Sequence, residues 1–145
     1  KAVPHMRARG GGAAVIVGSI SGKHSQPNRI VYPTTKAALL GLTRNMAHEL
    51  AADNIRVNLN TLGWTWSRNI ERRRGSRVAA DAFAAEFQLM GRMVDPEEAG
   101  DAVVFLCSDR SSAITGIDLA VDCGYDSVGP EAMGQAFEKH PYPQE

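Results

Sequence analysis

A serine, a tyrosine and a lysine early in the chain have the types and spacing that proton transfer requires. Ser19 precedes Tyr32 by thirteen positions, and Lys36 follows Tyr32 by four. At the start of a helix, two residues four positions apart lie on one face, one turn apart. An ammonium close to a phenol favours the phenolate, which brings the pKa of a tyrosine from about 10 toward the range of a general acid or base. A hydroxyl, a phenol and an ammonium that converge in this way suit proton transfer to or from an alcohol or a carbonyl.

The sequence pattern predicts the elements that would position these three residues. The apolar run at 13–17 predicts a buried strand, so Ser19 would follow the end of a strand. Residues 31–50 are expected to form a helix that begins near Tyr32. Its expected apolar face consists of Leu39, Leu42, Met46 and Leu50.

Strands and helices alternate along the rest of the chain. Alternating apolar and polar residues predict strands at 55–60 and 117–121, and the basic stretch 64–90 is expected to be locally helical. Asp95, Pro96 and Glu98 form the pattern of an N-cap, first-turn proline and capping box, which predicts a helix that continues to about Cys107. This alternation predicts parallel strands with helices on both faces of the sheet.

Several further segments occur in the order found in one known family. They are the serine segment at 17–22, the Tyr-x-x-x-Lys motif at 32–36, a strand at 54–58 before a turn at Leu62-Gly63, a helix start at 91–98 and a final strand at 114–122. At these positions the sequence resembles the short-chain dehydrogenase/reductase family. The resemblance implies an α/β fold, the C-terminal part of a Rossmann-like doubly wound parallel sheet with three αβα layers.

The resemblance also implies a function. Members are NAD(P)-dependent oxidoreductases, so the expected reaction interconverts a secondary alcohol and a ketone with NAD or NADP as cofactor. The expected substrate is a small alcohol or carbonyl compound, such as a polyol, a sugar or a 3-oxoacyl thioester. By this resemblance Tyr32 is the acid/base, Ser19 binds the substrate oxygen, and Lys36 supports Tyr32 and binds the nicotinamide ribose.

The resemblance assigns further cofactor-binding residues around the turn after the second strand. Gly63, Thr65 and Ser67 are the expected contacts to the nicotinamide, in addition to Tyr32 and Lys36. Two residues depart from the family pattern, since Leu62 stands where proline is usual and Ser67 where threonine is usual.

Members of this family begin with a strand, a glycine-rich turn and a helix whose N-terminus binds the cofactor pyrophosphate. No such pattern occurs in residues 1–145, so we expect the chain to be a C-terminal portion, with its catalytic part at 1–124 and a tail at 125–145. An alternative function follows from the same observation. The chain would then be a non-catalytic fragment that associates with other chains but does not bind cofactor.

Composition excludes few classes of function. The 16 basic and 16 acidic residues balance, which predicts neither nucleic-acid nor membrane binding. Cys107 and Cys123 do not form a disulfide framework or a metal cluster, and the four histidines lack metal-ligand spacing, so no metal site and a cytoplasmic location are expected. By resemblance we also expect a homo-oligomer, a tetramer or a dimer, that uses the Tyr-Lys helix and the final strand.

Two features allow alternative interpretations. Trp64 and Trp66 either form a lid over the substrate or cover the core. The second feature is a basic cluster that either binds an anionic substrate or is exposed on a mobile helix, and we favour exposure. This cluster consists of Arg68, Arg72, Arg73, Arg74 and Arg77.

Overall fold

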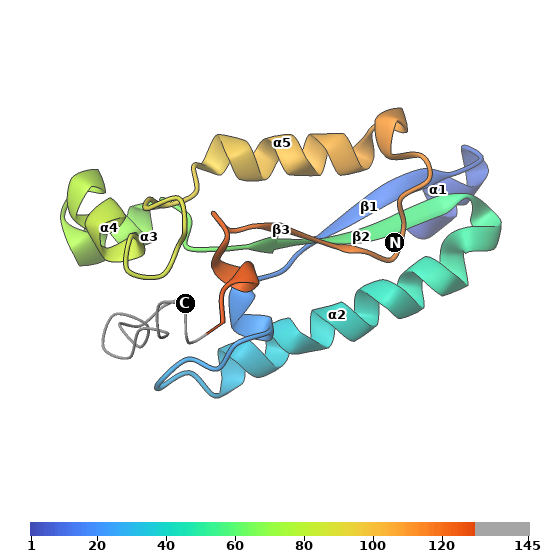
Figure 1. Cartoon of the computed structure of the whole chain (residues 1–145). Helices are drawn as coiled ribbons and strands as arrows, with labels where there is room; N and C mark the ends of the chain where they lie inside the picture. Colours follow the sequence, from blue (N-terminus) through green and yellow to red (C-terminus); the bar gives the residue numbers. More distant parts are fainter. Residues whose placement is uncertain (130–145) are drawn as a thin grey trace, which may run out of the picture.

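Parallel strands form the centre of the molecule, and helices lie on both faces of the sheet (Figure 1). The computed structural model describes residues 1–129. Within them the strands are β1 (Gly12–Val17), β2 (Ile55–Leu62) and β3 (Asp118–Val121), in the order β1-β2-β3 with both pairs parallel. The predicted strands are confirmed, and β2 extends two residues further toward the candidate site.

Long helices cover the two faces of this sheet. Helix α2 (Val31–Leu50) lies against one face and α5 (Pro96–Cys107) against the other, as Figure 1 shows. The short helices are α1 (Val3–Ala8), before β1, and α3 (Arg68–Arg74) and α4 (Arg77–Ala84), which follow β2. Single 3₁₀ turns occur at η1 (Ile20–Gly22) and η4 (Tyr125–Ser127), among others. The α/β class with parallel strands is therefore confirmed.

The central strand β2 is buried on both of its faces. Ile55, Val57 and Leu59 are at most 2% exposed, and the polar residues between them, Asn58 and Asn60, are at most 1% exposed. The amides of these two asparagines donate hydrogen bonds to the carbonyl oxygens of Ile114 (2.9 Å) and Ala99 (3.1 Å). Their alternation with apolar residues predicted the strand correctly, but these amides are buried because bonds to neighbouring segments replace water.

Helix α2 packs through a face that differs in part from the predicted one. Thr43, Ala47 and Leu50 are its buried residues, whereas Leu42 is 47% exposed. The prediction for Leu42 is therefore wrong. The side chains of Thr43 and Ala47 are small, which lets the helix approach β2 closely along that line.

The C-terminal part of the chain is described only in part. The predicted tail at 125–145 begins with η4, and residues 130–145 of that tail lie outside the described residues. Among residues 1–129, no helix combines the length and the apolar character needed to cross a bilayer.

Candidate active site

The candidate site lies where β1 and β2 end. Carboxyl ends of parallel strands meet at one edge of a sheet, and ligands of α/β proteins bind outside that edge. Figure 1 shows the start of α2, helices α3 and α4, and η4 gathered beyond this edge. A cavity of about 290 Å³ opens there between the segment after β1, the start of α2 and the segment after β2.

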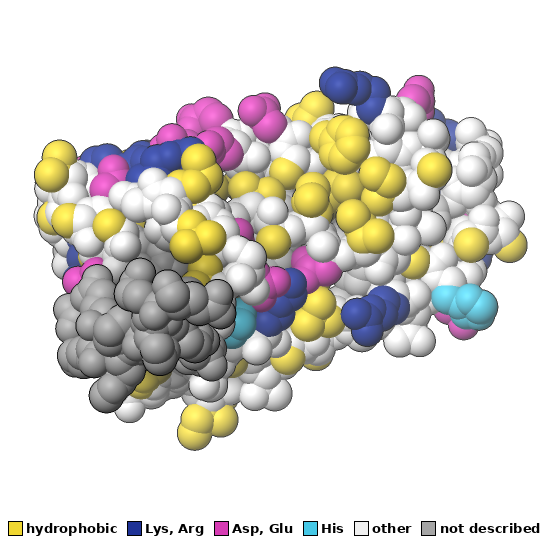
Figure 2. Space-filling view, in the orientation of Figure 1, with side chains coloured by type: hydrophobic (Ala, Val, Ile, Leu, Met, Phe, Trp, Pro, Cys, Tyr) yellow, Lys and Arg dark blue, Asp and Glu magenta, His cyan; other side chains and the backbone are white. Residues whose placement is uncertain are grey.

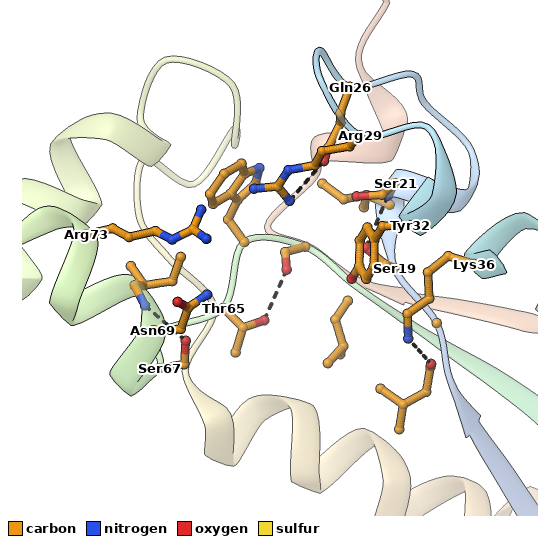
Figure 3. Close-up of a pocket in the computed structure, with 17 residues that line it drawn as sticks. Ser19, Ser21, Gln26, Arg29, Tyr32, Lys36, Thr65, Ser67, Asn69 and Arg73 are labelled. Carbon is orange, nitrogen blue, oxygen red and sulfur yellow. Dashed lines mark hydrogen bonds between the residues drawn. The ribbon is translucent and has the colours of Figure 1, made fainter. Parts of the chain in front are cut away.

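Ser19, Tyr32 and Lys36 all line this cavity (Figure 3). Ser19 is the N-cap of η1, where its Oγ accepts a hydrogen bond from the backbone N–H of Ser21 at 3.2 Å. Because the bond to Ser21 uses an acceptor site of the hydroxyl, the Ser19 hydroxyl proton can still be donated into the cavity. Ser21, the nearby competitor, is only 4% exposed.

Tyr32 and Lys36 occupy the first turns of α2, as their spacing predicted. Tyr32 is 44% exposed, so its phenol is accessible from solvent. The ammonium of Lys36 donates a hydrogen bond to the carbonyl oxygen of Val17 at 2.9 Å, and its Nζ lies 5.9 Å from the centroid of the Tyr32 ring. The end of β1 thus holds the Lys36 cation beside Tyr32.

Gly22 permits the close approach that brings η1 and α2 together. A Cβ at this position would lie 2.8 Å from the backbone carbon of Lys36 and 2.9 Å from the backbone nitrogen of Ala37. Backbone atoms cannot move away as a flexible side chain can, so any larger residue would force the two segments apart. The distance from Ser19 to the Tyr-Lys helix therefore depends on a residue without a side chain.

Gly63 is also required, for a packing contact that the sequence did not predict. The resemblance implied that this glycine allows a close approach of the cofactor. In the structure a Cβ here would lie 2.6 Å from the Cα of Asp122 and 2.7 Å from Oε1 of Gln88. Gly63 thus lets the segment after β2 pack against the end of β3, which shapes one wall of the cavity.

Thr65 and Ser67 line the same cavity, and both make local hydrogen bonds. The Thr65 hydroxyl donates to the carbonyl oxygen of Gly63 at 3.2 Å. Ser67 is the N-cap of α3 and accepts a hydrogen bond from the backbone N–H of Ile70 at 3.4 Å. The structure therefore brings all six predicted site residues to one cavity.

Gln88 supports the cavity wall formed by the segment after β2, a role that the sequence analysis did not predict. It is 1% exposed, and its Oε1 accepts a hydrogen bond from the backbone N–H of Trp64 at 2.7 Å. Its Nε2 donates to the carbonyl oxygen of Arg92 at 2.5 Å. A single glutamine in the stretch 64–90, which was expected to be locally helical, gives no sequence signal of this role, because its partners lie 24 residues upstream and four residues downstream.

The two tryptophans differ in their surroundings. Both pack against the buried cluster of Ala80, Ala84 and Met93, which confirms the interpretation that they cover the core. Trp64 also lines the cavity, and its ring contacts the ring of Phe83 edge-on with centroids 5.1 Å apart. This contact holds Trp64 in place as a fixed apolar wall of the cavity.

The basic cluster divides into residues with structural contacts and one residue at the cavity. Arg77 forms ion pairs with Asp81 at 2.9 Å and with Asp95, and the guanidinium of Arg74 lies 3.5 Å from the centroid of the Phe83 ring. Arg73, by contrast, lines the cavity. Arg68, Arg72, Arg73 and Arg74 are exposed, as expected, whereas Arg77 is half-buried; Arg73 is exposed and also lines the cavity.

An ionic cluster fixes the segment after Ser19 to the end of the described chain. Lys23 forms ion pairs with Asp118 at 2.6 Å and Asp126 at 2.5 Å, and Nε2 of His24 lies 2.9 Å from a carboxylate oxygen of Asp126. Partial burial disfavours the Asp126 carboxylate, but its hydrogen bonds to Lys23 and His24 outweigh this effect and lower its pKa. These contacts connect η4 and β3 to one side of the cavity.

Fold and site together define an α/β protein with a ligand site at the carboxyl edge of a parallel sheet. A family model described as enoyl-(acyl carrier protein) reductase matches residues 1–126. Curated relatives include cis-4-hydroxycyclohexanecarboxylate dehydrogenase of Sinomonas cyclohexanicum, which is 40% identical over 127 residues, or 88% of this chain and 50% of that protein. Dehydrogenase/reductase SDR family member 4 of Mus musculus is 41% identical over 125 residues, or 86% of this chain and 44% of that protein.

Solved structures agree with these matches. L-sorbose reductase from Gluconobacter frateurii, solved with NADPH and L-sorbose, superposes with a TM-score of 0.80 at 32% identity, and the match covers 88% of this chain and 52% of that one. The chain belongs to the short-chain dehydrogenase/reductase family. It spans about half the length of the curated relatives that it matches.

Proposed function

We propose that this chain carries the catalytic residues of an NAD(P)-dependent oxidoreductase that interconverts a secondary alcohol and a ketone. The observation that supports this most is that Ser19, Tyr32 and Lys36 line one cavity at the carboxyl edge of the sheet. Membership of a family whose relatives described above are named as dehydrogenases and reductases points in the same direction. A polyol, a sugar or a 3-oxoacyl thioester fits the proposed substrate class.

Residues from two sides of the cavity fit the nicotinamide end of the cofactor. The ammonium of Lys36 is suited to the ribose hydroxyls, and the hydroxyls of Thr65 and Ser67 to the carboxamide. A structure of L-sorbose reductase contains NADPH, and a relative from Beutenbergia cavernae contains NADP. When bound, the nicotinamide would accept or donate the hydride, so the chain itself need only bind, orient and move a proton.

In this proposal each of the three residues has a separate task. Tyr32 transfers the proton of the substrate hydroxyl through its phenolic oxygen. Ser19 donates its hydroxyl proton to the substrate oxygen, because the N–H of Ser21 already occupies an acceptor site of Ser19. Lys36, held by the carbonyl of Val17, keeps its ammonium beside Tyr32, where it can also bind the ribose hydroxyls of the cofactor.

A homo-oligomer is part of the proposal, because large apolar side chains are exposed on the helices and near the last strand. Figure 2 shows hydrophobic side chains gathered over α5 and β3 on the face in view. Val104 of α5 is 68% exposed, Ile117 before β3 is 40% exposed, and Leu42 of α2 is 47% exposed. Burial of such residues against another copy of the chain would remove apolar surface from water.

The test of the function uses the complete gene product, assayed with neutral secondary alcohols and their ketones and with both NAD and NADP. We expect nicotinamide absorbance to change in the presence of at least one alcohol. Tyr32→Phe should lower kcat by a factor of about 10² to 10⁴ with little effect on the melting temperature, since it removes only the reacting hydroxyl.

Tyr125→Phe is the matched control, because it removes the same atom from a tyrosine that does not line the cavity. Its activity should stay at the wild-type level. Turnover by Tyr32→Phe at the wild-type rate would show that Tyr32 is not the acid/base. Absence of turnover and of cofactor binding in the complete protein would instead favour the non-catalytic alternative.

A further inference from the structure

Two arginines from separate segments line the candidate active site. Arg29 belongs to the segment before α2, and Arg73 belongs to the last turn of α3. Both line the cavity of Ser19 and Tyr32, and both line the adjoining hollow together with Asn69. In Figure 3 their side chains extend toward one another from opposite sides of the cavity.

Neither arginine has an acidic partner among residues 1–129. Arg29 donates a hydrogen bond of 3.4 Å to Oε1 of Gln26, a neutral group, and no ion pair involves Arg29 or Arg73 in this part of the chain. Nearby Arg77 and Arg92 differ, since both are ion-paired with carboxylates. Within residues 1–129, no carboxylate pairs with the guanidinium of Arg29 or Arg73, so donors of both are available to a ligand.

The lining of the cavity makes it electrostatically positive. Within residues 1–129, its basic lining residues are Arg29, Lys36 and Arg73, and no aspartate or glutamate lines it. A guanidinium keeps its charge at every physiological pH and presents donors in a fork that matches the oxygens of a carboxylate or a phosphate. Two such forks with the amide of Asn69 beside them are suited to one anionic group.

Apolar side chains line the same cavity beside the reacting groups and the two arginines. Leu62, Trp64 and Ile70 line the same cavity, and Trp64 is fixed by its contact with Phe83. A ligand whose hydroxyl or carbonyl lies at Ser19 and Tyr32 would therefore place an apolar body along this wall. Its far end would lie between Arg29 and Arg73.

We propose that Arg29 and Arg73 form a subsite for the anionic group of the substrate, which is an alcohol or ketone that carries a carboxylate or a phosphate monoester away from the reacting carbon. This inference rests on the proposed function for the identity of the reacting carbon. Arg29 and Arg73 are specificity-determining residues here. The alternative source of the anion is a phosphate of the cofactor, and the experiment distinguishes the two.

The experiment compares paired substrates of the complete gene product. 4-Hydroxycyclohexanecarboxylate is paired with its neutral carboxamide, and a hydroxyalkyl phosphate with the matching diol. We expect kcat/KM to be higher for each anionic member. Arg29→Gln and Arg73→Gln should each reduce the anionic-to-neutral ratio of kcat/KM by about 10- to 100-fold, the range for loss of a charged hydrogen-bond donor. The neutral substrates should keep their kcat/KM.

Arg72→Gln is the matched control, because it removes the same charge from the same helix at an exposed residue that does not line the cavity. Its ratio should equal that of the wild type. Equal kcat/KM for the anionic and neutral members of both pairs, with turnover intact, would overturn the subsite while the proposed function stands. Arginine variants that weaken binding of NAD or NADP and leave the ratio unchanged would assign the pair to the cofactor and overturn the subsite as well.

A binding measurement gives a readout that does not depend on turnover. Cyclohexanecarboxylate, which has no reactive hydroxyl, is titrated calorimetrically into the complete protein, with cyclohexanecarboxamide as the neutral comparison. We expect the carboxylate to bind and the carboxamide not to bind. Added salt and Arg73→Gln should each weaken binding of the carboxylate. This result without oxidation of any alcohol would support the anion subsite and contradict only the proposed function. No binding of either compound, together with equal kinetics, would overturn the subsite.

Discussion

Cys123 has a backbone conformation that L residues rarely adopt. Its φ is 52°, in the left-handed region, and it directly follows Asp122 at the end of β3. A residue with a Cβ is strained there by about 1 kcal/mol or more, whereas glycine is not. By resemblance to the family, glycine is common at this position. Partial burial also raises the pKa of the Cys123 thiol, so this side chain is a neutral thiol at neutral pH.

We therefore expect Cys123→Gly to maintain or raise stability, by up to about 1 kcal/mol, since relief of strain outweighs the added freedom of the unfolded chain. Cys107→Gly is the matched control, because Cys107 is the last residue of helix α5 and is exposed. That change should lower stability, by up to about 1 kcal/mol. Thermal unfolding of wild type, Cys123→Gly and Cys107→Gly measures both changes in stability. A lower melting temperature for Cys123→Gly would show that its side chain contributes more than its backbone strain costs.

At the scale of elements, the start of α5 is stabilised by a cluster of charged residues and hydrogen bonds around Glu98. The Glu98 carboxylate accepts hydrogen bonds from the guanidinium of Arg92 at 2.7 and 2.8 Å and from the backbone N–H of Asp95 at 2.8 Å. These bonds complete the predicted capping box, which is confirmed. The hydrogen bond to Arg92, followed by that to the Asp95 backbone, lowers the pKa of Glu98 from 4.5 to about 2.

This shift predicts how stability depends on pH. A carboxylate whose pKa is lower in the folded state stabilises the fold at pH values above its unfolded-state pKa of 4.5. That contribution is lost as the pH falls from 4.5 toward 2. Glu98→Gln should therefore unfold at a lower temperature than wild type at pH 7, and the difference should shrink toward pH 2. Because the side chain is partly exposed to solvent, we expect a modest effect.

Glu97→Gln is the control for this series, because Glu97 is an exposed neighbour on the same helix. Its melting temperature should follow that of wild type across the range. A constant difference between Glu98→Gln and wild type from pH 7 to pH 2 would contradict the lowered pKa, and would assign the role of Glu98 to packing alone.

At the scale of the whole molecule, residues 1–129 contain the edge of the sheet with the candidate active site but not a glycine-rich phosphate turn. Residues 12–62 and 118–121 contribute parallel strands whose order is β1-β2-β3, so β1 and β3 are the edges within residues 1–129. Unpaired strand edges favour association with other chains. In the family, by resemblance, the pyrophosphate binds at a helix N-terminus after a glycine-rich turn.

A polypeptide of residues 1–145 alone should therefore bind NAD(H) and NADP(H) weakly and should show negligible dehydrogenase activity. Calorimetric titration with each cofactor measures the first expectation, and a nicotinamide absorbance assay measures the second. Size-exclusion chromatography should show association at the unpaired edges. Micromolar binding of either cofactor by this polypeptide would mean that residues 1–145 contain a phosphate site of another kind.

Much of the architecture was predictable because it depends on local patterns. An apolar run marked β1, alternation marked β2 and β3, and helix α2 spans Val31–Leu50, the predicted range. The capping residues located the start of α5 for the same reason, since a cap is a contact between residues three positions apart. Burial was less predictable. Leu42 is exposed and Asn60 is buried, because burial depends on which face the neighbouring elements cover.

The sequence by itself identified three candidate catalytic residues, the strand end and the helix start that position them, and the class of fold. Those features depend on residue type and on short spacings along the chain, both of which can be read from the sequence. Only the tertiary structure decided that Arg29 and Arg73, 44 positions apart, line one cavity, and that Gln88 supports its wall. Contacts between distant residues depend on how the strands and helices pack, and a glycine such as Gly22 shows its role only when the backbone it approaches is in place.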